Sequence, residues 1–430
     1  MNITQRITQL RQHLKDPLYR NSIFLITNTA VTTGLGFFFW MIVARYYREY
    51  EVGVGAAIIS SVTFLALLST LGLDAVIVRF LSKAERPVEL INSCLIITGI
   101  VALVVSGIFL AGLDLWSPAT RFVRDNGMFI LSFLFFAVAW ALSMVLDSVY
   151  VAMRRAEFNL AKNTIFSLLK IPLPIILTIF FHAFGIVSSW GIATGIALAI
   201  SFFLFLPRVQ QSYKLALKID LGIIKSVWKY SAGNYFSQIF MAAPFLLLPV
   251  IIVNVVDAKQ NAYFYVAWMI AGLLFNIPAA VSQSLFAEGS HAEKDLATNS
   301  RRSFKFVVLL LVPAIIIVVL LGKYLLLLFG ENYSSNAMRL LWILGFSSLF
   351  TGVNYIYYSI LRVRGRIGEL VALRGLAALA VLITSAIVTP ILGIVGIGYA
   401  WIGAQALVSI YVLLAVRMRL RAMRLRRSDS

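Results

Sequence analysis

Twelve apolar stretches, separated by short polar segments, fill almost all of the chain. Each has about 20 residues, the length that an α-helix needs to cross the hydrocarbon core of a bilayer. The stretches are Ser22–Ala44, Val52–Leu73, Ile91–Leu113, Gly127–Met153, Asn163–Phe181, Gly185–Leu206, Tyr230–Val256, Ala262–Ala287, Phe306–Gly322, Leu340–Leu361, Leu370–Thr389 and Gly393–Val416. We therefore predict an all-α polytopic membrane protein with twelve transmembrane helices.

The gaps between these stretches limit what else the chain can contain. The longest gaps lie around Val209–Lys229 and Glu288–Lys305, and both are far shorter than a domain. They leave no room for a soluble catalytic domain or an ATPase. Composition agrees with a membrane protein, because hydrophobic residues make up 60% of the chain and the mean hydropathy is +0.90.

The formal net charge of +19 has to be interpreted by position, since basic residues accumulate on the cytoplasmic side of membrane proteins. With a cytoplasmic N-terminus, most of the 37 basic residues fall in inner loops, including the C-terminal run Arg417–Arg427. We therefore expect a multi-pass protein of the cell (plasma or inner) membrane with both termini in the cytoplasm. The charge is spread over every inner loop, with no folded basic module, so we expect no nucleic acid partner.

The two ends of the chain and its single cysteine add smaller constraints. Ile3, Ile7, Leu10 and Leu14 recur at helical spacing among polar residues, which predicts an amphipathic helix on the inner leaflet. No small-residue cleavage site follows the first long apolar run, which does not resemble a signal peptide. Cys94 is the only cysteine, which excludes intramolecular disulfides and multi-thiolate metal sites.

An internal repeat indicates two halves. A shift of 208 residues places Tyr150–Arg154 on Tyr358–Arg362 and Gly185–Val187 on Gly393–Val395. Six helices per half give both halves the same orientation, with a pseudo-two-fold axis along the membrane normal and a cavity between the lobes. Chance similarity among apolar helices is the alternative. We predict an N-terminal lobe at residues 1–215 (the amphipathic helix and six spans) and a C-terminal lobe at residues 216–430 (six spans and a basic tail).

Several short motifs carry a resemblance to a known family. They are Ala44–Gly53, Leu71–Asp74, Val78–Phe80, Ala262–Tyr265, Phe329–Tyr333, Arg364–Arg366 and Gly393–Gly398. In order and spacing the chain resembles the polysaccharide transporter (Wzx-type oligosaccharide flippase) family of the multidrug, oligosaccharidyl-lipid and polysaccharide exporter (MOP) superfamily. The resemblance implies a MATE-like transporter fold and export of lipid-linked oligosaccharide by alternating access between two lobes.

Other branches of this superfamily fit less well. The lipid II flippases resemble a fourteen-helix plan, whereas the residues here suffice for twelve. Drug-extruding members typically carry an acidic residue in the first span or in the seventh and eighth. The corresponding stretches Ser22–Ala44, Tyr230–Val256 and Ala262–Phe286 contain no Asp or Glu.

Charged residues inside spans are candidates for function, because burying a charge in a bilayer is costly. Lys170 lies eight residues beyond Lys162, or ~12 Å deeper at 1.5 Å per residue, beside Pro172 and Pro174, which we expect to kink the helix. Its ammonium suits a phosphate. Alternatively, Lys170 forms a structural ion pair with Asp147, which is also a candidate coupling carboxylate.

The second half offers a similar group in Arg374, eight residues from Arg366 in the eleventh span. A cavity role for Arg374 is one interpretation, and an Arg that extends to the inner headgroups is the other. Arg45, Arg48 and Arg79 stand at helix ends marked by the family motif. Their guanidinium groups would suit a polyprenyl pyrophosphate or, alternatively, anionic lipid headgroups, which we favour for Arg48.

Polar side chains inside spans complete the candidate cavity. Asn28 and Thr32 belong to a polar stripe of the first span, and Asn234 and Gln238 to one of the seventh. Amides and hydroxyls there suit sugar hydroxyls, but hydrogen bonds between helices are an equal alternative. The substrate-binding candidates are Lys170, Arg374, Arg45, Arg79, Asn28, Thr32, Asn234 and Gln238.

Absent motifs exclude other classes. The chain has no phosphate-binding loop of the ATPase type, and the histidines His13, His182 and His291 are isolated. We therefore expect no cofactor, no metal site and no enzymatic activity.

The sequence thus predicts a transporter that moves a polyprenyl-(pyro)phosphate-linked oligosaccharide from the inner to the outer leaflet for glycan biosynthesis. The alternative is a cation-coupled small-molecule or multidrug antiporter. We expect a monomer whose partners are the glycolipid substrate and membrane lipids, and whose coupling ion, H⁺ or Na⁺, the sequence leaves open.

Overall fold

The computed structural model describes residues 17–211, 213–214, 216, 221–291 and 295–428. The predicted amphipathic helix around Ile3–Leu14 lies outside these residues. Within them, twelve helical segments are long and apolar enough to cross a membrane, which confirms the predicted number of spans. The contacts divide the chain after Tyr235 into a first unit, Met1–Tyr235, and a second unit, Phe236–Ser430. The predicted boundary at residues 215/216 stays a prediction.

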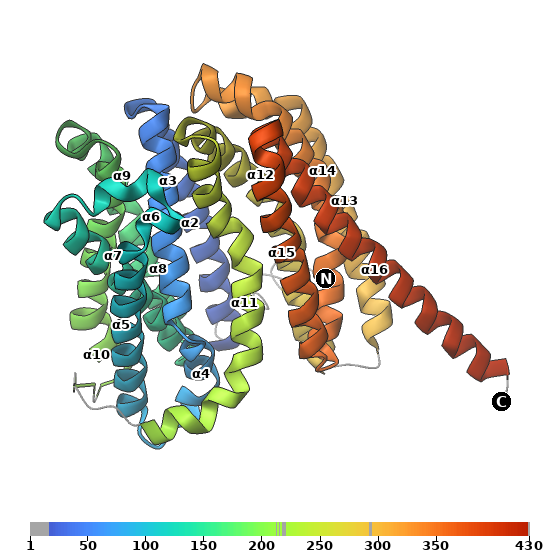
Figure 1. The fold of residues 1–430 in the computed structure, drawn as a ribbon. Helices are drawn as coiled ribbons and strands as arrows, with labels where there is room; N and C mark the ends of the chain where they lie inside the picture. Colours follow the sequence, from blue (N-terminus) through green and yellow to red (C-terminus); the bar gives the residue numbers. More distant parts are fainter. Residues whose placement is uncertain (1–16, 212, 215, 217–220, 292–294, 429–430) are drawn as a thin grey trace, which may run out of the picture. The chain divides into compact units, whose positions relative to one another are not determined.

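The first unit contains six spans (Figure 1). Its helices are α2 (Pro17–Tyr46), α3 (Glu49–Ser69), α4 (Leu73–Phe80), α5 (Pro87–Ala111), α6 (Leu113–Trp116), α7 (Gly127–Ala152), α8 (Ala156–Leu169), α9 (Leu173–Ile200) and α10 (Leu206–Val209). Short 3₁₀ turns occupy Leu81–Lys83 and Pro118–Val123, and a π-helical turn occupies Ser201–Phe205.

The second unit is built from longer helices. They are α11 (Leu221–Val255), which begins in the first unit, α12 (Ala258–His291), α13 (Leu296–Leu327), α14 (Glu331–Val363), α15 (Ile367–Leu392) and α16 (Ile394–Ser428). Helix α13 starts ten residues before the predicted stretch at Phe306, because polar residues at its beginning continue the helix beyond the apolar part.

Packing partners repeat between the units. In the first unit, α7 packs against α3, α5 and α9, and in the second, α14 packs against α12, α13 and α16. These helices hold the same ordinal positions in their halves. The repeat found in the sequence therefore corresponds to a repeated packing scheme.

Local sequence sets where helices begin and end. Pro87 opens α5 at its first turn, where a missing N–H costs nothing, and the Asn126 side chain accepts a hydrogen bond from Met128 N to cap α7. The second span ends at Ser69 rather than at the predicted Leu73, because Leu71 (φ 49°) and Gly72 (φ 76°) turn the chain before α4.

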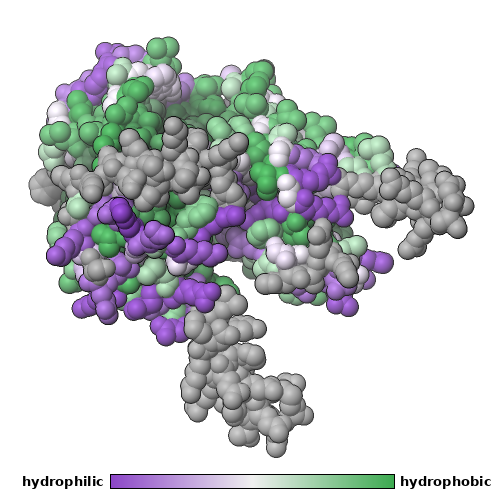
Figure 2. All heavy atoms as spheres, turned by 90° about the horizontal axis from the view of Figure 1, so that it is seen from below, coloured by the Kyte–Doolittle hydropathy of each residue, from purple (hydrophilic) through white to green (hydrophobic). Residues whose placement is uncertain are grey.

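Apolar side chains cover the flanks of many spans. Leu309 and Leu320 of α13 are 67% and 69% exposed, and only 22% of the most apolar window of this span is buried within the protein. Exposed apolar flanks of this kind are expected where helices face lipid, since lipid is as apolar as the side chains. On the face seen from below, hydrophilic residues gather between areas of hydrophobic surface (Figure 2).

Candidate functional site

Charged side chains lie inside spans in each unit. In the first unit they are Asp147 of α7, Lys162 of α8 and Lys170 at the end of α8. In the second unit the central one is Arg374 of α15.

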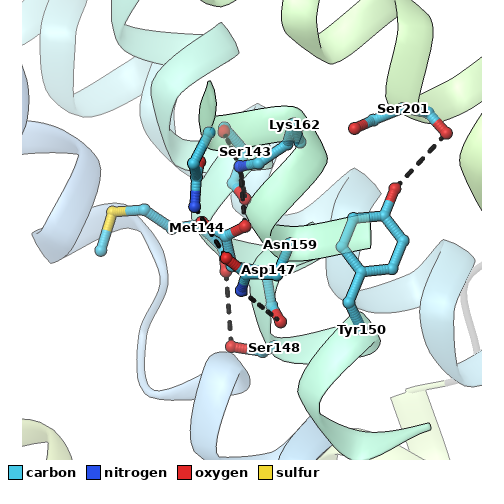
Figure 3. A network of polar contacts seen from close by, with 9 residues as sticks. Ser143, Met144, Asp147, Ser148, Tyr150, Asn159, Lys162 and Ser201 are labelled. Carbon is cyan, nitrogen blue, oxygen red and sulfur yellow. Dashed lines mark hydrogen bonds and ion pairs between the residues drawn. The ribbon is translucent and has the colours of Figure 1, made fainter. Parts of the chain in front are cut away.

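In the first unit, Lys162 is held by oxygen atoms of α7 (Figure 3). Its Nζ lies 2.8 Å from Asp147 Oδ1 and 3.1 Å from the Ser143 carbonyl oxygen, and it also donates to Ser143 Oγ. The Lys162 side chain is 1% exposed, whereas that of Asp147 is 31% exposed. The Lys162 side chain is therefore buried, and part of the Asp147 side chain is exposed although Oδ1, which meets Lys162, is buried.

Amides of α8 extend this network. Asn163 Nδ2 donates to Asn159 Oδ1 at 2.7 Å, and the Asn163 side chain also lies close to the Asp147 carboxylate. Because Ser143 and Asp147 are four residues apart, as are Asn159 and Asn163, each pair lies on one face of its helix. Asp147 is thus paired with Lys162 rather than with Lys170.

Lys170 stands where the fifth span is interrupted. Helix α8 ends at Leu169 and α9 begins at Leu173, so the helical path is broken at the predicted site next to Pro172. Tyr47, directly after α2, donates through its Oη to the Pro174 carbonyl oxygen at 2.8 Å, which ties the end of α2 to the first turn of α9 beside this break. The expectation that prolines interrupt this helix is therefore confirmed.

The Lys170 ammonium is surrounded by aromatic rings. Nζ lies 4.6 Å from the centroid of Phe166 and 5.2 Å from that of Phe39, and the residue is 7% exposed. Trp140 and Trp190 pack against Phe166 at centroid distances of 5.5 and 5.7 Å. Cation–π contacts compensate only part of the cost of burying an ammonium. Among the described residues no carboxylate pairs with Lys170.

In the second unit, Arg374 faces a cavity of about 50 Å³. Its Nη1 donates to Ser237 Oγ at 2.8 Å, and the guanidinium carbon lies 5.0 Å from the ring centroid of Tyr358. The buried Nε has no acceptor within the described part of the chain. Arg374 therefore keeps unused hydrogen-bonding capacity beside an open space.

Aromatic rings and amides line the rest of this cavity. The lining includes Phe245 and Trp401, whose ring centroids are 5.5 Å apart, and Tyr355. Asn354 Nδ2 donates to Gln405 Oε1 at 2.8 Å, and Ser409 Oγ donates to Asn354 Oδ1 at 2.9 Å. These hydrogen bonds hold the Asn354 amide in place, whereas Trp401 Nε1 and Arg374 Nε are buried without a hydrogen-bond partner in the described part of the chain.

The other predicted residues are spread over the spans. Arg45 and Arg79 are exposed, in the last turns of α2 and α4. Arg48 precedes α3, where its backbone N–H donates to Glu51 Oε2. A role for these arginines in binding the substrate stays a prediction.

The polar stripe residues are half-buried. Thr32 Oγ1 donates to the Asn28 carbonyl oxygen of its own helix at 2.7 Å, while Asn28 Oδ1 is buried without a donor in the described structure. Asn234 and Gln238 of α11 are also half-buried. A role for these four residues in binding sugar hydroxyls stays a prediction.

Sequence reasoning missed the central residue of the first unit. The predicted fifth span starts at Asn163 and leaves Lys162 just outside it, but the helix begins at Ala156 and Lys162 lies six residues inside it. The sequence does contain a pattern that indicates this network. Ser143 and Asp147 are four residues apart in one span, and Asn159 and Asn163 are four residues apart at the next, so each pair shares one face of its helix.

Comparison with known proteins identifies related chains. A family model described as "Polysaccharide biosynthesis protein" matches residues 18–286. No curated protein matches the chain. The fold is similar to that of the lipid II flippase MurJ in an inward closed conformation, with a TM-score of 0.73 and 15% identity over 92% of this chain and 87% of MurJ.

Two further structures show the same fold. One is an inward-facing multidrug resistance MATE family transporter of the MOP superfamily, with a TM-score of 0.69 and 17% identity over 91% of this chain and 95% of the other. The second is a MOP superfamily transporter from Pyrococcus furiosus Vc1, with a TM-score of 0.65 and 18% identity over 96% and 98% of the two chains. At these identities the likeness establishes the fold, an all-helical MOP arrangement with twelve spans.

Proposed function

Because the chain belongs to the polysaccharide biosynthesis protein family of membrane transporters in the MOP superfamily, we propose that it flips a lipid-linked oligosaccharide from the inner to the outer leaflet. The substrate would carry its glycan on a polyprenyl phosphate or pyrophosphate. The resemblance of the motifs to oligosaccharide flippases supports this proposal, and so does the likeness of the fold to a lipid II flippase.

One observation carries the choice of substrate. Each unit holds a basic side chain inside its spans that pairs with no carboxylate among the described residues, Lys170 in the first unit and Arg374 in the second. An uncompensated buried cation is costly, and an anionic ligand would relieve that cost. A phosphate is such a ligand, whereas the lipophilic cations moved by drug exporters would be repelled.

The surroundings of Arg374 suit the rest of such a substrate. Arg374 offers a planar guanidinium for phosphate oxygens or a sugar carboxylate, and the amides Asn354 and Gln405 with the ring of Trp401 stand around the same cavity. Aromatic faces and fixed amides are groups that bind sugar rings and hydroxyls. At about 50 Å³ the cavity holds only a small group, so a sugar would require the helices to move apart.

Cells depleted of the protein test the proposal. We expect lipid-linked oligosaccharide to accumulate on the cytoplasmic leaflet and a surface polymer to be lost, with unchanged sensitivity to cationic dyes. Raised dye sensitivity with intact surface glycans would instead support the cation-coupled antiporter and overturn the flippase proposal.

Alternating access and the cytoplasmic location of both termini belong to the same proposal. Single cysteines at Asn28 and Asn234, in a Cys94→Ser background, should react with a water-soluble maleimide to an extent that changes with conformation. Constant protection at both positions would show that these side chains pack against other helices. The sidedness of the termini is tested by the accessibility of terminal tags in intact cells.

A further inference from the structure

The environment of Lys162 has the form of a site for a monovalent cation. Three oxygen atoms of α7 surround its Nζ, namely Ser143 Oγ, the Ser143 carbonyl oxygen at 3.1 Å and Asp147 Oδ1 at 2.8 Å. A carboxylate, a carbonyl and a hydroxyl are hard oxygen ligands, the type that binds alkali and alkaline-earth cations. An ammonium ion resembles a potassium ion in charge and radius.

The two partners differ in exposure. Lys162 is 1% exposed, whereas the Asp147 side chain that pairs with it (Figure 3) is 31% exposed. A cation that approached from the exposed side would meet the Asp147 carboxylate first. The position between Asp147 and Ser143 would already be occupied by the Lys162 ammonium. The Asn163 amide lies beside the carboxylate, and Asn159 Nδ2 donates to the Asp147 carbonyl oxygen at 3.5 Å.

The second unit provides an independent observation. The 208-residue shift places Asp147 on Tyr355 and Lys162 on Leu370. The carboxylate and the ammonium are therefore both absent from the equivalent positions of the other half. The loss of both groups at the equivalent positions is expected if the carboxylate and the ammonium form one site.

We propose that Ser143 and Asp147 form a monovalent-cation site that is permanently filled by the ammonium of Lys162. The first unit thus carries its own tethered cation, and the protein needs no Na⁺ or K⁺ at Asp147. This has a consequence for transport that rests on the proposed function. Flipping requires neither Na⁺ nor K⁺ at Asp147.

Removing the tethered cation tests the site in the purified full-length protein. Lys162→Ala removes both the charge and the side-chain volume, so that Na⁺ or K⁺ can enter and restore the charge. We expect NaCl or KCl, compared with choline chloride at equal ionic strength, to raise the Tm of Lys162→Ala by roughly 5 °C or more. Wild-type protein should show no such difference.

Lys162→Met is the matched control, because it removes the charge but keeps the place filled. Neither salt should raise its Tm, and the double variant Lys162→Ala/Asp147→Asn should also lose the response. If Lys162→Ala gains no response to either cation, the contact is a structural ion pair only and the proposal is wrong.

Two other outcomes would also overturn it. One is an Asp147-dependent rise in the Tm of wild-type protein with NaCl or KCl. The other is that Lys162→Ala yields no folded protein in buffer with NaCl or KCl, whereas Lys162→Met does. A cation bound at Asp147 should stabilise Lys162→Ala, so this result would contradict the proposal. These measurements involve no glycolipid, so failure of the flippase proposal would not affect them.

Discussion

The α7–α8 region of the first unit and the α14–α15 region of the second occupy equivalent places in the repeat but hold charge differently. In the first, the Asp147 carboxylate pairs with Lys162 at 2.8 Å. In the second, the corresponding residues are Tyr355 and Leu370, and Arg374 takes the place of Phe166. The two halves therefore share a helix-packing scheme but differ in their polar chemistry.

Two kinds of buried cation result from this difference. Lys162 has a counter-charge within the protein, whereas Lys170 and Arg374 rest mainly on aromatic rings and a serine. A compensated charge contributes to a stable lobe, and an uncompensated one is better suited to a ligand. We therefore predict that substitutions of the Asp147–Lys162 pair change stability, whereas substitutions of Lys170 or Arg374 change transport.

The largest effect should come from breaking the compensated pair. Asp147→Ala leaves Lys162 buried without a counter-charge, which should lower the free energy of unfolding by about 3–5 kcal/mol. Thermal unfolding in detergent measures the loss. The double variant Asp147→Ala/Lys162→Met should recover most of it, and equal stabilities of the single and double variants would show that the two charges are not coupled.

Removal of the uncompensated cation of the first unit should act on transport. Lys170→Met should reduce flipping by on the order of a hundredfold, since a charge-assisted contact to phosphate contributes ~2–3 kcal/mol. Lys170→Arg should keep part of the activity. Flipping of a fluorescent polyprenyl-pyrophosphate glycan in proteoliposomes gives the rate, and an unchanged Tm shows retained folding. Normal transport by Lys170→Met would remove Lys170 from the substrate contacts.

A smaller loss is expected when Arg374 keeps its charge but loses its shape. Arg374→Lys lacks the planar fork and should transport about tenfold more slowly, equivalent to ~1.4 kcal/mol. Arg374→Met should be slower still. The same proteoliposome assay serves, with Arg301→Lys as the control at an exposed position outside the candidate site. Equal rates for Arg374→Lys and wild type would indicate that only the charge matters.

The smallest effect concerns the helix break, which has no counterpart in the continuous α15 of the second unit. Tyr47→Phe removes the hydrogen bond to the Pro174 carbonyl oxygen and should cost about 1 kcal/mol of stability. Tyr46→Phe, at an exposed neighbouring position, is the control and should be neutral. A neutral Tyr47→Phe would mean that the break needs no support from α2.

The sequence by itself determined the number of spans, the helical class, the repeat and the family. These properties follow from apolar length and from short motifs, which act locally and can be counted along the chain. The interruption at Pro172 was also predictable, because proline removes a backbone donor wherever it stands.

Only the tertiary structure decided which charges are compensated. Lys162 and Lys170 look alike in the sequence, and their difference arises because α7 presents Ser143 and Asp147 to one of them and aromatic rings surround the other. Arg374 was recognised as a buried cation, but its cavity is formed by residues from α11, α14 and α16. Contacts between helices depend on their rotation and depth, which hydrophobic periodicity in a membrane leaves undefined because both lipid and neighbouring helices accept apolar faces.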